Sequence, residues 1–213
     1  MAQNKLRIVL TKGRLEQKTI KLLEKMGYDC DNAINKGRKL TTQIDGGNIE
    51  LVFAKAADAL TYVDAGVCDM GVVGKDTIEE YDKSFYEICD LGFGKCRFAV
   101  AAPKGKDIYD NYNIKCIATK YPNIAKKYFE GKNVDVNIVK IEGSVELAPL
   151  LSLADAIVDI VETGSTLKEN GLEIVEEIMP ISARLIVNTA SMKMKKAEIE
   201  KFVSLVEKYK DEV

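Results

Sequence analysis

Residues that could bind a phosphorylated sugar gather in one short segment, Asp155–Leu167, which reads D-A-I-V-D-I-V-E-T-G-S-T-L. The apolar run Ala156–Val161 predicts a buried strand that carries one carboxylate, Asp159. That carboxylate needs a hydroxyl, an N–H group or a cation as its partner, because its surroundings are apolar. The turn Thr163–Thr166 consists of hydroxyl residues around a glycine, and such a turn can aim N–H groups and hydroxyls at one phosphate. The same turn could also do no more than cap the next helix.

Two cations flank a glycine directly after the first predicted strand, Leu6–Leu10. Lys12 and Arg14 stand on either side of Gly13, whose missing side chain lets the backbone approach a ligand closely. In α/β folds, sites form at the carboxyl ends of strands, which is where this turn falls. Arginine can bind a phosphate through two parallel hydrogen bonds, so the pattern predicts a pyrophosphate or polyphosphate site. The alternative is a solvated helix start.

Three further stretches carry charges whose role the sequence leaves open. Arg38 belongs to the basic cluster Lys36–Lys39, which is typical of a charged surface but could also meet a polyanion. Lys55 ends a predicted strand and could point into a cleft or out to water. The stretch Asp69–Asp76 reads as a strand followed by a glycine-flanked turn, for which ordinary turn chemistry is the alternative explanation.

The composition of the 213 residues excludes several classes of protein and mechanism. A net charge of −2, from 31 basic and 33 acidic residues, leaves no basic footprint for DNA or RNA. The chain contains no histidine, which rules out Ser-His-Asp and Cys-His catalysis and metal sites with histidine ligands. No apolar signal core or membrane-spanning stretch is found, so we expect a cytoplasmic protein. The five cysteines form no C-x-x-C pair and are expected to be reduced core thiols.

Strand-like and helix-like segments alternate along the chain, which predicts an α/β fold of mainly parallel sheets with flanking helices. After Leu6–Leu10, the predicted strands are 49–53, 69–73, 85–91, 97–101, 115–118, 134–141, 156–161, 173–178 and 183–187. The predicted helices are 15–26, 56–65, 77–81, one that starts near Pro122, 145–153, and an amphipathic C-terminal helix with Ile199, Phe202, Val203 and Val206 on its apolar stripe. Pro149 should kink the 145–153 helix or mark its start. Neither a P-loop nor a G-x-G-x-x-G motif is found, which disfavours a kinase-like or Rossmann oxidoreductase fold.

Taken together, these stretches resemble the short-form ATP phosphoribosyltransferases, the first enzymes of histidine biosynthesis. The similarity covers nearly the whole chain and includes L-T-K-G-R-L at Leu10–Leu15, Y-V-D-A-G-V-C-D-M-G-V-V-G-K-D at Tyr62–Asp76 and G-S-V-E-L-A-P at Gly143–Pro149. The most specific part of the similarity is a family pattern of a glutamate, a small residue and the motif D-[LIV]-x-x-[ST]-G-x-T-[LM]. The residues of this chain at those positions are Glu146, Ala154, Asp159, Ile160, Thr163, Gly164, Thr166 and Leu167. Two positions depart from the family: Ser152 stands where glycine is usual, and Lys55 stands where many relatives carry arginine.

The resemblance implies a two-lobed fold similar to type II periplasmic binding proteins. The first lobe would contain residues 1–94 and 180–213, and the second lobe, residues 95–179, would carry the phosphate loop. The resemblance also implies a homodimer within a larger hetero-oligomer, whose separate regulatory subunit looks like histidyl-tRNA synthetase. A non-catalytic ligand-binding module of the periplasmic-binding type is the alternative with the same architecture. Other phosphoribosyltransferases usually carry two adjacent acidic residues before such a loop, whereas here Ile160 follows Asp159.

The implied reaction transfers phosphoribosyl from 5-phosphoribosyl 1-pyrophosphate to the adenine ring of ATP and releases pyrophosphate. The resemblance assigns phosphoribosyl binding to Asp159, Thr163, Gly164, Ser165 and Thr166. It assigns ATP or pyrophosphate binding to Lys12, Gly13, Arg14 and Asp69. The implied catalytic set is Arg14, Arg38, Lys55 and Asp159, with Arg38 able to serve a neighbouring subunit's site. Mg²⁺ is the expected cofactor, and Asp159 would meet it together with the substrate.

Overall fold

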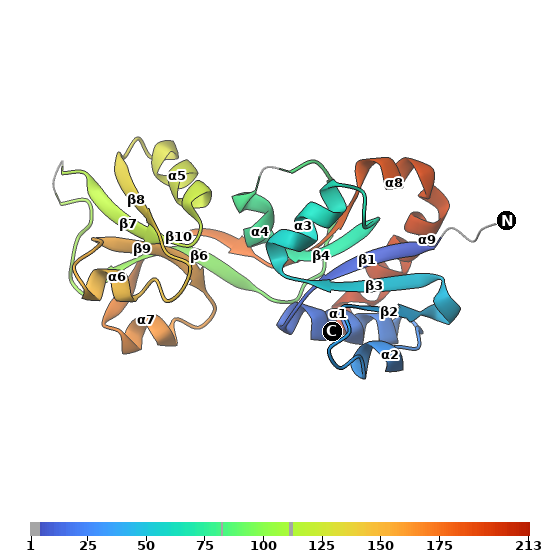
Figure 1. The fold of residues 1–213 in the computed structure, drawn as a ribbon. Coiled ribbons are helices and arrows are strands. Elements are labelled where there is room, and N and C mark those ends of the chain that lie inside the picture. Colours follow the sequence, from blue (N-terminus) through green and yellow to red (C-terminus); the bar gives the residue numbers. More distant parts are fainter. Residues whose placement is uncertain (1–4, 82, 111–112) are drawn as a thin grey trace. The chain divides into compact units, whose positions relative to one another are not determined.

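The chain forms two compact units in the computed structural model, which describes residues 5–81, 83–110 and 113–213 (Figure 1). One unit contains Met1–Gly94 and Ser182–Val213, and the other is Lys95–Ile181. The second boundary lies between residues 181 and 182, whereas the predicted one lies between residues 179 and 180. The reason is that β10 (Leu172–Ile181) stays paired with β6 (Cys96–Pro103) as far as the pair Ile181–Cys96.

The first unit is built on a six-stranded sheet with the order β2-β3-β1-β4-β11-β5. Its strands are β1 (Leu6–Thr11), β2 (Thr41–Ile44), β3 (Ile49–Ala54), β4 (Met70–Gly74), β5 (Tyr86–Asp90) and β11 (Ala183–Val187). β1 pairs in parallel with both β3 and β4, whereas the pairs β2–β3, β4–β11 and β11–β5 are antiparallel. The parallel centre therefore brings the carboxyl ends of β1, β3 and β4 to one edge of the sheet.

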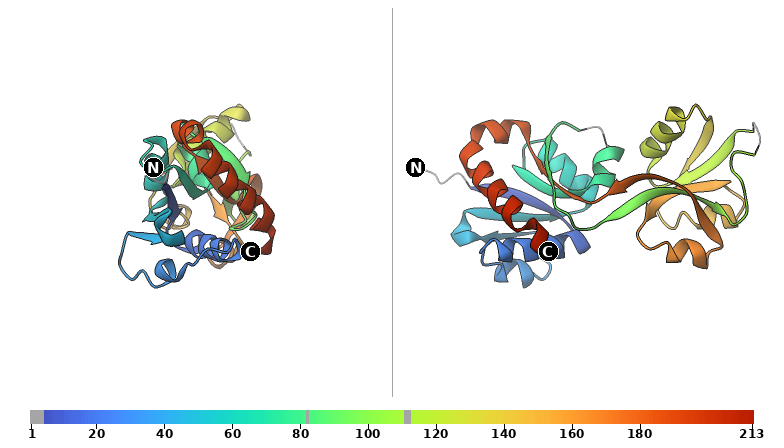
Figure 2. Two further views of the ribbon diagram at one scale, coloured as in Figure 1. Left: turned by 90° about the vertical axis from the view of Figure 1, so that its right-hand side faces the viewer. Right: turned by 180° about the vertical axis from the view of Figure 1, so that it is seen from behind.

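Helices cover both faces of this sheet: α1 (Arg14–Lys25), α2 (Asp31–Ile34), α3 (Ala56–Asp64), α4 (Lys75–Glu80), α8 (Thr189–Met194) and α9 (Lys196–Tyr209), with 3-10 turns η1 (Asp45–Gly47) and η2 (Lys210–Glu212). The core on one face joins Leu23 of α1 and Phe202 of α9 to the strands, and Figure 2 shows α9 lying along the first unit. The core on the other face joins Leu60 and Val63 of α3 to Val9 of β1.

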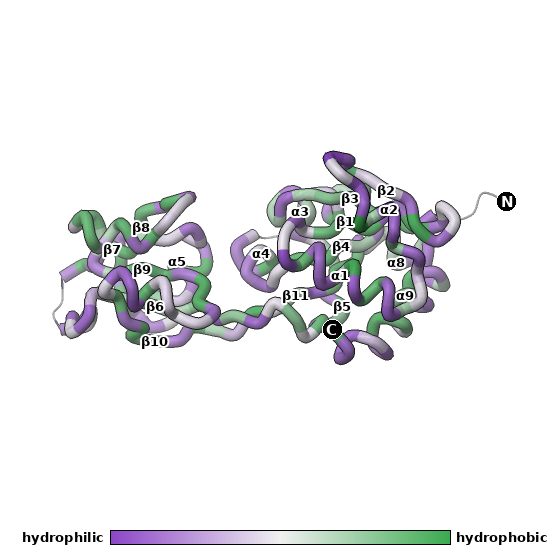
Figure 3. The backbone as a smooth tube through the Cα atoms, turned by 90° about the horizontal axis from the view of Figure 1, so that it is seen from below, coloured by the Kyte–Doolittle hydropathy of each residue, from purple (hydrophilic) through white to green (hydrophobic). Residues whose placement is uncertain are grey.

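The second unit has a five-stranded sheet with the order β10-β6-β9-β7-β8, which includes β7 (Lys115–Thr119), β8 (Val136–Lys140) and β9 (Ala156–Val161). β7 pairs in parallel with β8 and β9, and β6 pairs in antiparallel fashion with β9 and β10. Helix α5 (Pro122–Gly131) packs on one face, while α6 (Leu147–Leu150) and α7 (Ser165–Glu169) pack on the other. Figure 3 shows hydrophobic stretches on the strands of both units.

The observed elements confirm the predicted α/β class, but several helices differ from the prediction. The predicted 145–153 helix is reduced to the four residues of α6. Ser152 has φ +57, in the left-handed region that glycine adopts without strain, so the chain turns out of the helix at this position. Glycine, which the resemblance leads us to expect here, would adopt this conformation without strain. The short elements α2, β2, α7 and α8 were not predicted from the sequence.

Candidate active site

Four of the predicted basic and glycine residues lie at the carboxyl edge of the first sheet. Lys12 follows β1, and its N–H donates to the carbonyl of Ala54 at the end of β3, at 2.9 Å. Thr11 pairs with Ala54, so Lys12 and Lys55 leave the sheet side by side. Gly13 and Arg14 then begin α1, and Lys55 begins α3.

The loop that carries Arg38 reaches the same edge by another route. The N–H of Phe53, near the end of β3, donates to the carbonyl of Leu40 at 2.9 Å. Arg38 lies two residues before Leu40 and is exposed. The antiparallel pairing of β2 with β3 therefore brings Arg38 to the edge where Lys12 and Lys55 lie.

The cations at this edge are largely uncompensated. Lys12, Arg38 and Lys55 are exposed, and within the described part of the chain none of their side chains forms a hydrogen bond or ion pair. Arg14 does have an interaction partner. Like charges brought together raise the free energy of the empty site, and a polyanion lowers it again. This edge is therefore suited to a pyrophosphate or a triphosphate.

Asp69, predicted to act with Lys12–Arg14, lies at the other end of the first sheet. Its carboxylate accepts hydrogen bonds from the Arg7 N–H, the Ser191 hydroxyl and the Lys195 ammonium, each at 2.8 Å. Its N–H donates to the carbonyl of Arg7 at 2.8 Å. Arg7 and Lys12 are separated by about 16 Å along β1, because a strand rises by about 3.3 Å per residue. Asp69 has a structural role here and stands apart from the cations.

The predicted strand with Asp159 is β9 of the second unit. Val158 pairs with Thr119, the last residue of β7, so Asp159 lies just beyond the carboxyl end of β7 and near that of β9. The Thr119 hydroxyl donates to the Val158 carbonyl at 2.7 Å, which joins the two strand ends. Lys120 follows Thr119 in the chain and is exposed.

Asp159 is half-buried, and this environment changes its protonation. Burial raises the pKa of Asp159 to about 6, and the charge of Glu146 raises it as well. A hydrogen bond with the backbone of Ile160 and the charge of Lys120 act in the opposite direction. Desolvation disfavours the ionised form, so Asp159 gains from any cation or hydroxyl group that approaches it.

The turn after β9 has the geometry expected from its sequence. Gly164 has φ +81, a left-handed conformation that glycine adopts without strain, and it precedes the first residue of α7. The Thr163 and Ser165 hydroxyls lie 3.0 Å apart, and the Ser165 N–H donates to Thr163 Oγ1 at 3.4 Å. Thr163, Ser165 and Thr166 are exposed. The turn thus presents three hydroxyls to solvent, and it follows Asp159 in the chain after only three residues.

Sequence reasoning missed Lys120 as a neighbour of Asp159, although it directly follows a predicted strand. It also missed Lys36 and Glu16, which form an ion pair with 2.8 Å between Lys36 Nζ and Glu16 Oε1. Nothing in their spacing of twenty residues suggests the pair, because the contact depends on how the loop before β2 folds back.

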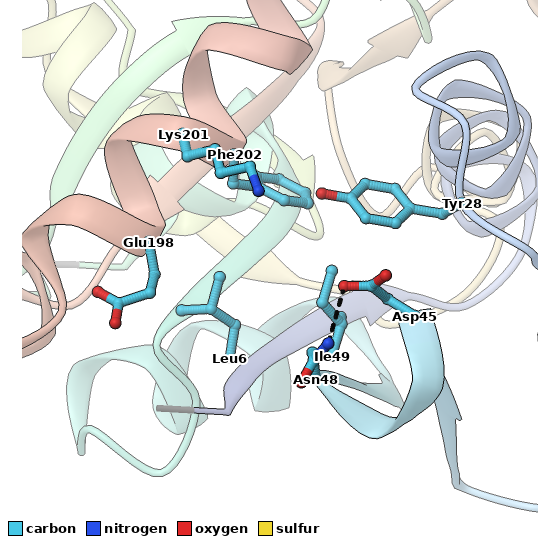
Figure 4. A pocket seen from close by; sticks show the side chains of 8 residues that line it. All are labelled: Leu6, Tyr28, Asp45, Asn48, Ile49, Glu198, Lys201 and Phe202. Carbon is cyan, nitrogen blue, oxygen red and sulfur yellow. Dashed lines mark hydrogen bonds between the residues drawn. The ribbon is translucent and has the colours of Figure 1, made fainter. Parts of the chain in front are cut away.

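The first unit contains a cavity of about 250 Å³ at the opposite, amino edge of its sheet (Figure 4). It is lined by Leu6, Tyr28, Asp45, Asn48, Ile49, Glu198, Lys201 and Phe202. Leu6 and Ile49 are the first residues of β1 and β3, and the lining includes none of the predicted site residues.

Two properties of the described residues bear on ligands and location. They contain no group of three or more His, Cys, Asp or Glu side chains placed to hold a metal ion. None of their helices is long and apolar enough to span a membrane.

A family model described as "HisG: ATP phosphoribosyltransferase" matches residues 55–208, which is more than half of the chain. The chain belongs to the ATP phosphoribosyltransferase family. An ATP phosphoribosyltransferase of Clostridium kluyveri is 60% identical over 205 residues, or 96% of this chain and 94% of the relative. That of Clostridium novyi is 58% identical over 95% of this chain and 96% of the relative, and that of Bacillus cereus is 54% identical over 95% of each.

A solved structure of the "ATP phosphoribosyl transferase (HisG:HisZ) complex from Thermotoga maritima" has the same fold as this chain. Its TM-score is 0.83 at 35% identity, and the match covers 98% of this chain and 100% of that one. The predicted fold, similar to type II periplasmic binding proteins, is thereby confirmed.

Membership of the ATP phosphoribosyltransferase family confirms several predictions from the sequence. The chain is a pentosyltransferase of the first step of histidine biosynthesis, and not a non-catalytic binding module. The curated relatives have nearly the length of this chain, as the resemblance to short-form ATP phosphoribosyltransferases requires. The roles of the individual site residues remain predictions.

Proposed function

We propose that the Asp159 carboxylate and the Thr163–Thr166 turn bind the phosphoribosyl group of 5-phosphoribosyl 1-pyrophosphate during its transfer to ATP. The observation that carries this assignment is the placement of three exposed hydroxyls around Gly164, directly after the strand that holds Asp159. Backbone N–H groups and hydroxyls at such a turn suit the 5-phosphate. The half-buried Asp159 would accept hydrogen bonds from the ribose hydroxyls, which would favour its ionised form.

The carboxyl edge of the first sheet would bind the pyrophosphate group of the donor and the triphosphate of ATP. Lys12, Arg14, Arg38 and Lys55 supply the positive charge there, and the backbone at Gly13 allows close approach. Lys55 can neutralise charge but cannot make the bidentate contact of the arginine that many relatives carry. Stabilisation of the leaving pyrophosphate is the main chemical task, because negative charge grows on it as its bond to the ribose carbon breaks.

The nucleophile needs little help from the protein. The attacking adenine nitrogen already carries a lone pair, so the new N–C bond can form without prior removal of a proton. The enzyme has no histidine at any position, which accords with a mechanism of positioning and charge neutralisation rather than general base catalysis.

Mg²⁺ remains the expected cofactor, and the residues present fit one way of binding it. Mg²⁺ usually keeps several waters and is held by substrate phosphates and one or two carboxylates. Asp159, with Glu146 nearby, offers such a partial set of ligands. When bound, the metal would offset negative charge on the donor substrate.

We also propose that the enzyme works as a homodimer within a larger hetero-oligomer that includes a separate regulatory subunit. The similarity to the Thermotoga maritima HisG:HisZ complex supports a partner of this kind. The subunit expected from the sequence resembles histidyl-tRNA synthetase. A cytoplasmic location is part of the proposal, because ATP is a substrate.

Release of pyrophosphate in the presence of ATP and 5-phosphoribosyl 1-pyrophosphate tests the proposed function. The assay should be run on the purified chain alone and again with the histidyl-tRNA-synthetase-like subunit of the same organism. We expect release that depends on both substrates and on Mg²⁺, and that increases when the subunit is added. Absence of release in both arms, with a folded chain and a co-eluting subunit, would contradict the proposal.

A further inference from the structure

The segment that carries Arg38 is attached to α1 by an ion pair that is largely shielded from solvent. Lys36 Nζ lies 2.8 Å from Glu16 Oε1, and the two side chains are only 18% and 12% exposed. The same ammonium lies 4.6 Å from the centre of the Phe53 ring. A lysine between a carboxylate and an aromatic face has lost most of its water and most of its freedom to move. Lys36 is therefore more firmly fixed than a lysine in an exposed surface ion pair.

The three partners belong to elements that define the proposed cation site. Glu16 is in the first turn of α1, two residues after Arg14. Phe53 is the penultimate residue of β3, two residues before Lys55. Lys36 precedes Arg38 by two residues, and the intervening Gly37 has φ +59, which turns the chain sharply between them. The pair therefore fixes the segment to the two elements that supply Arg14 and Lys55.

Charge explains why such a fixing point is needed. The segment Lys36–Lys39 carries three cations and would be repelled by Lys12, Arg14 and Lys55 at the same edge. The Glu16 carboxylate offsets this repulsion at one point. It does so inside the unit, so that Arg38 remains available to a ligand.

We propose that Glu16 and Lys36 are positioning residues, which hold Arg38 at the carboxyl edge of the first sheet so that it is ready to bind polyphosphate. This inference rests on the proposed function, since it takes Arg38 to be a substrate-binding residue. Neither Glu16 nor Lys36 touches the substrate in this scheme. They act by removing the cost of ordering a flexible, positively charged loop when the substrate binds.

The test compares Lys36→Met and Glu16→Gln with Lys39→Met. Lys39 is exposed in the same loop, so its substitution removes an equal charge without breaking the pair. We expect Lys36→Met and Glu16→Gln to lower kcat/KM by about 10- to 100-fold, the order of loss that follows small misplacements in active sites. Lys39→Met should stay within about twofold of wild type, as for other surface charges.

A second readout follows the loop itself. The Lys39 N–H donates to the Lys36 carbonyl at 3.1 Å, so hydrogen exchange of this amide reports the order of the loop. Exchange at residues 36–40 should accelerate in Lys36→Met and Glu16→Gln while the strands stay protected. Adding Arg38→Ala to Lys36→Met should cause no further loss of kcat/KM, because Arg38 is then already misplaced.

The outcomes separate the inference from the proposed function. If Lys36→Met matches Lys39→Met in both readouts, the inference is overturned. If the loop loosens and Arg38→Ala lowers kcat/KM but Lys36→Met does not, the pair is structural only, and the inference is again overturned. If Arg38→Ala itself has no kinetic effect while pyrophosphate release persists, the role of Arg38 in the proposed site fails and the positioning role fails with it.

Discussion

The ionised form of Asp159 lowers the stability of the fold that contains it. It lies at the end of an apolar strand, where desolvation raises its pKa to about 6. The native state therefore binds a proton more tightly than the unfolded chain between about pH 4 and pH 6. In this range the unfolding free energy contributed by Asp159 falls as pH rises. At neutral pH the protein keeps an ionised carboxylate that its surroundings disfavour, as expected for a ligand-binding group.

Replacing this carboxylate should separate activity from stability. Asp159→Asn should lower kcat/KM by about 100-fold or more, by analogy with the loss of one preorganised polar group. It should also remove the part of the fall in unfolding free energy between pH 4 and pH 6 that comes from Asp159. Pyrophosphate release and urea unfolding across this pH range measure the two effects. Asp135→Asn, an exposed site in the same unit, is the control and should change neither. Wild-type turnover in Asp159→Asn would refute the role of this carboxylate.

The Thr166 hydroxyl is exposed at the start of α7, and the proposed site gives it to the 5-phosphate. Thr166→Val keeps the shape of the side chain but removes the hydroxyl. The KM for 5-phosphoribosyl 1-pyrophosphate should rise about 10- to 100-fold, because a hydrogen bond to a charged group contributes about 1.5–3 kcal/mol. Steady-state kinetics with Thr61→Val, an exposed threonine on α3, provides the matched comparison. A KM equal to that of the control would argue against the assignment of the turn.

At the scale of elements, the two ends of the first sheet have different roles: the carboxyl end carries proposed ligand-binding residues, and the amino end carries a structural hydrogen-bond network. The carboxyl ends of β1 and β3 release the chain into turns that carry Lys12 and Lys55. The amino ends are held together by the Asp69 network, which fixes α8 and its following residue Lys195 to β1 and β4. Asn188 adds to this network: its side chain accepts hydrogen bonds from the N–H groups of Ala190 and Ser191 at the start of α8, at 3.0 and 2.9 Å.

Loss of the Asp69 carboxylate should therefore affect folding far more than catalysis. Asp69→Ala leaves the Arg7 N–H, the Ser191 hydroxyl and the part-buried Lys195 ammonium without their shared acceptor, and a buried polar group left unpaired costs about 1–3 kcal/mol. Urea unfolding should show this loss, while the KM for ATP stays near wild type under conditions where the variant is folded. Glu200→Ala on the exposed side of α9 should cost less than about 0.5 kcal/mol. A large rise in the KM for ATP with unchanged stability would return Asp69 to the nucleotide site.

At the scale of the whole molecule, the two units differ in how they use the chain. The second unit is one continuous segment, and its five strands and both of its cores lie within residues 95–181. The first unit needs both ends of the protein. β11 lies between β4 and β5, and Ile199, Phe202 and Val206 of α9 belong to its core.

This difference predicts unequal behaviour of fragments. A fragment of residues 95–181 should fold alone, with the circular dichroism of a mixed α/β domain and cooperative unfolding in urea. A fragment of residues 1–94 should not fold, because its sheet would lack an internal strand and its core would lack α9. Restoring residues 182–213 through a short linker should recover a cooperative transition. Cooperative folding of 1–94 without them would contradict this view of the core.

The sequence predicted the elements whose patterns are strong and local. β9 was predicted because its apolar run is bounded by turn residues, and the position of the Gly164 turn followed from its own letters. Elements with little internal pattern were missed: β2 is a four-residue edge strand, T-T-Q-I, without clear alternation. The 145–153 helix was predicted too long, since apolar periodicity does not reveal that Ser152 adopts a left-handed conformation.

The letters of this chain by themselves determined its family, its α/β class and the residue types able to bind a phosphorylated sugar. The sequence suffices for the family, the fold class and these residue types because each depends on short runs of neighbouring residues that specify a strand, a turn or a motif. Which of these residues meet was decided only by tertiary structure. Strand pairing places Lys12 beside Lys55 and Asp69 at the opposite end of the sheet, because pairing depends on strand direction and register. Packing of the loop before β2 against α1 brings Lys36 to Glu16.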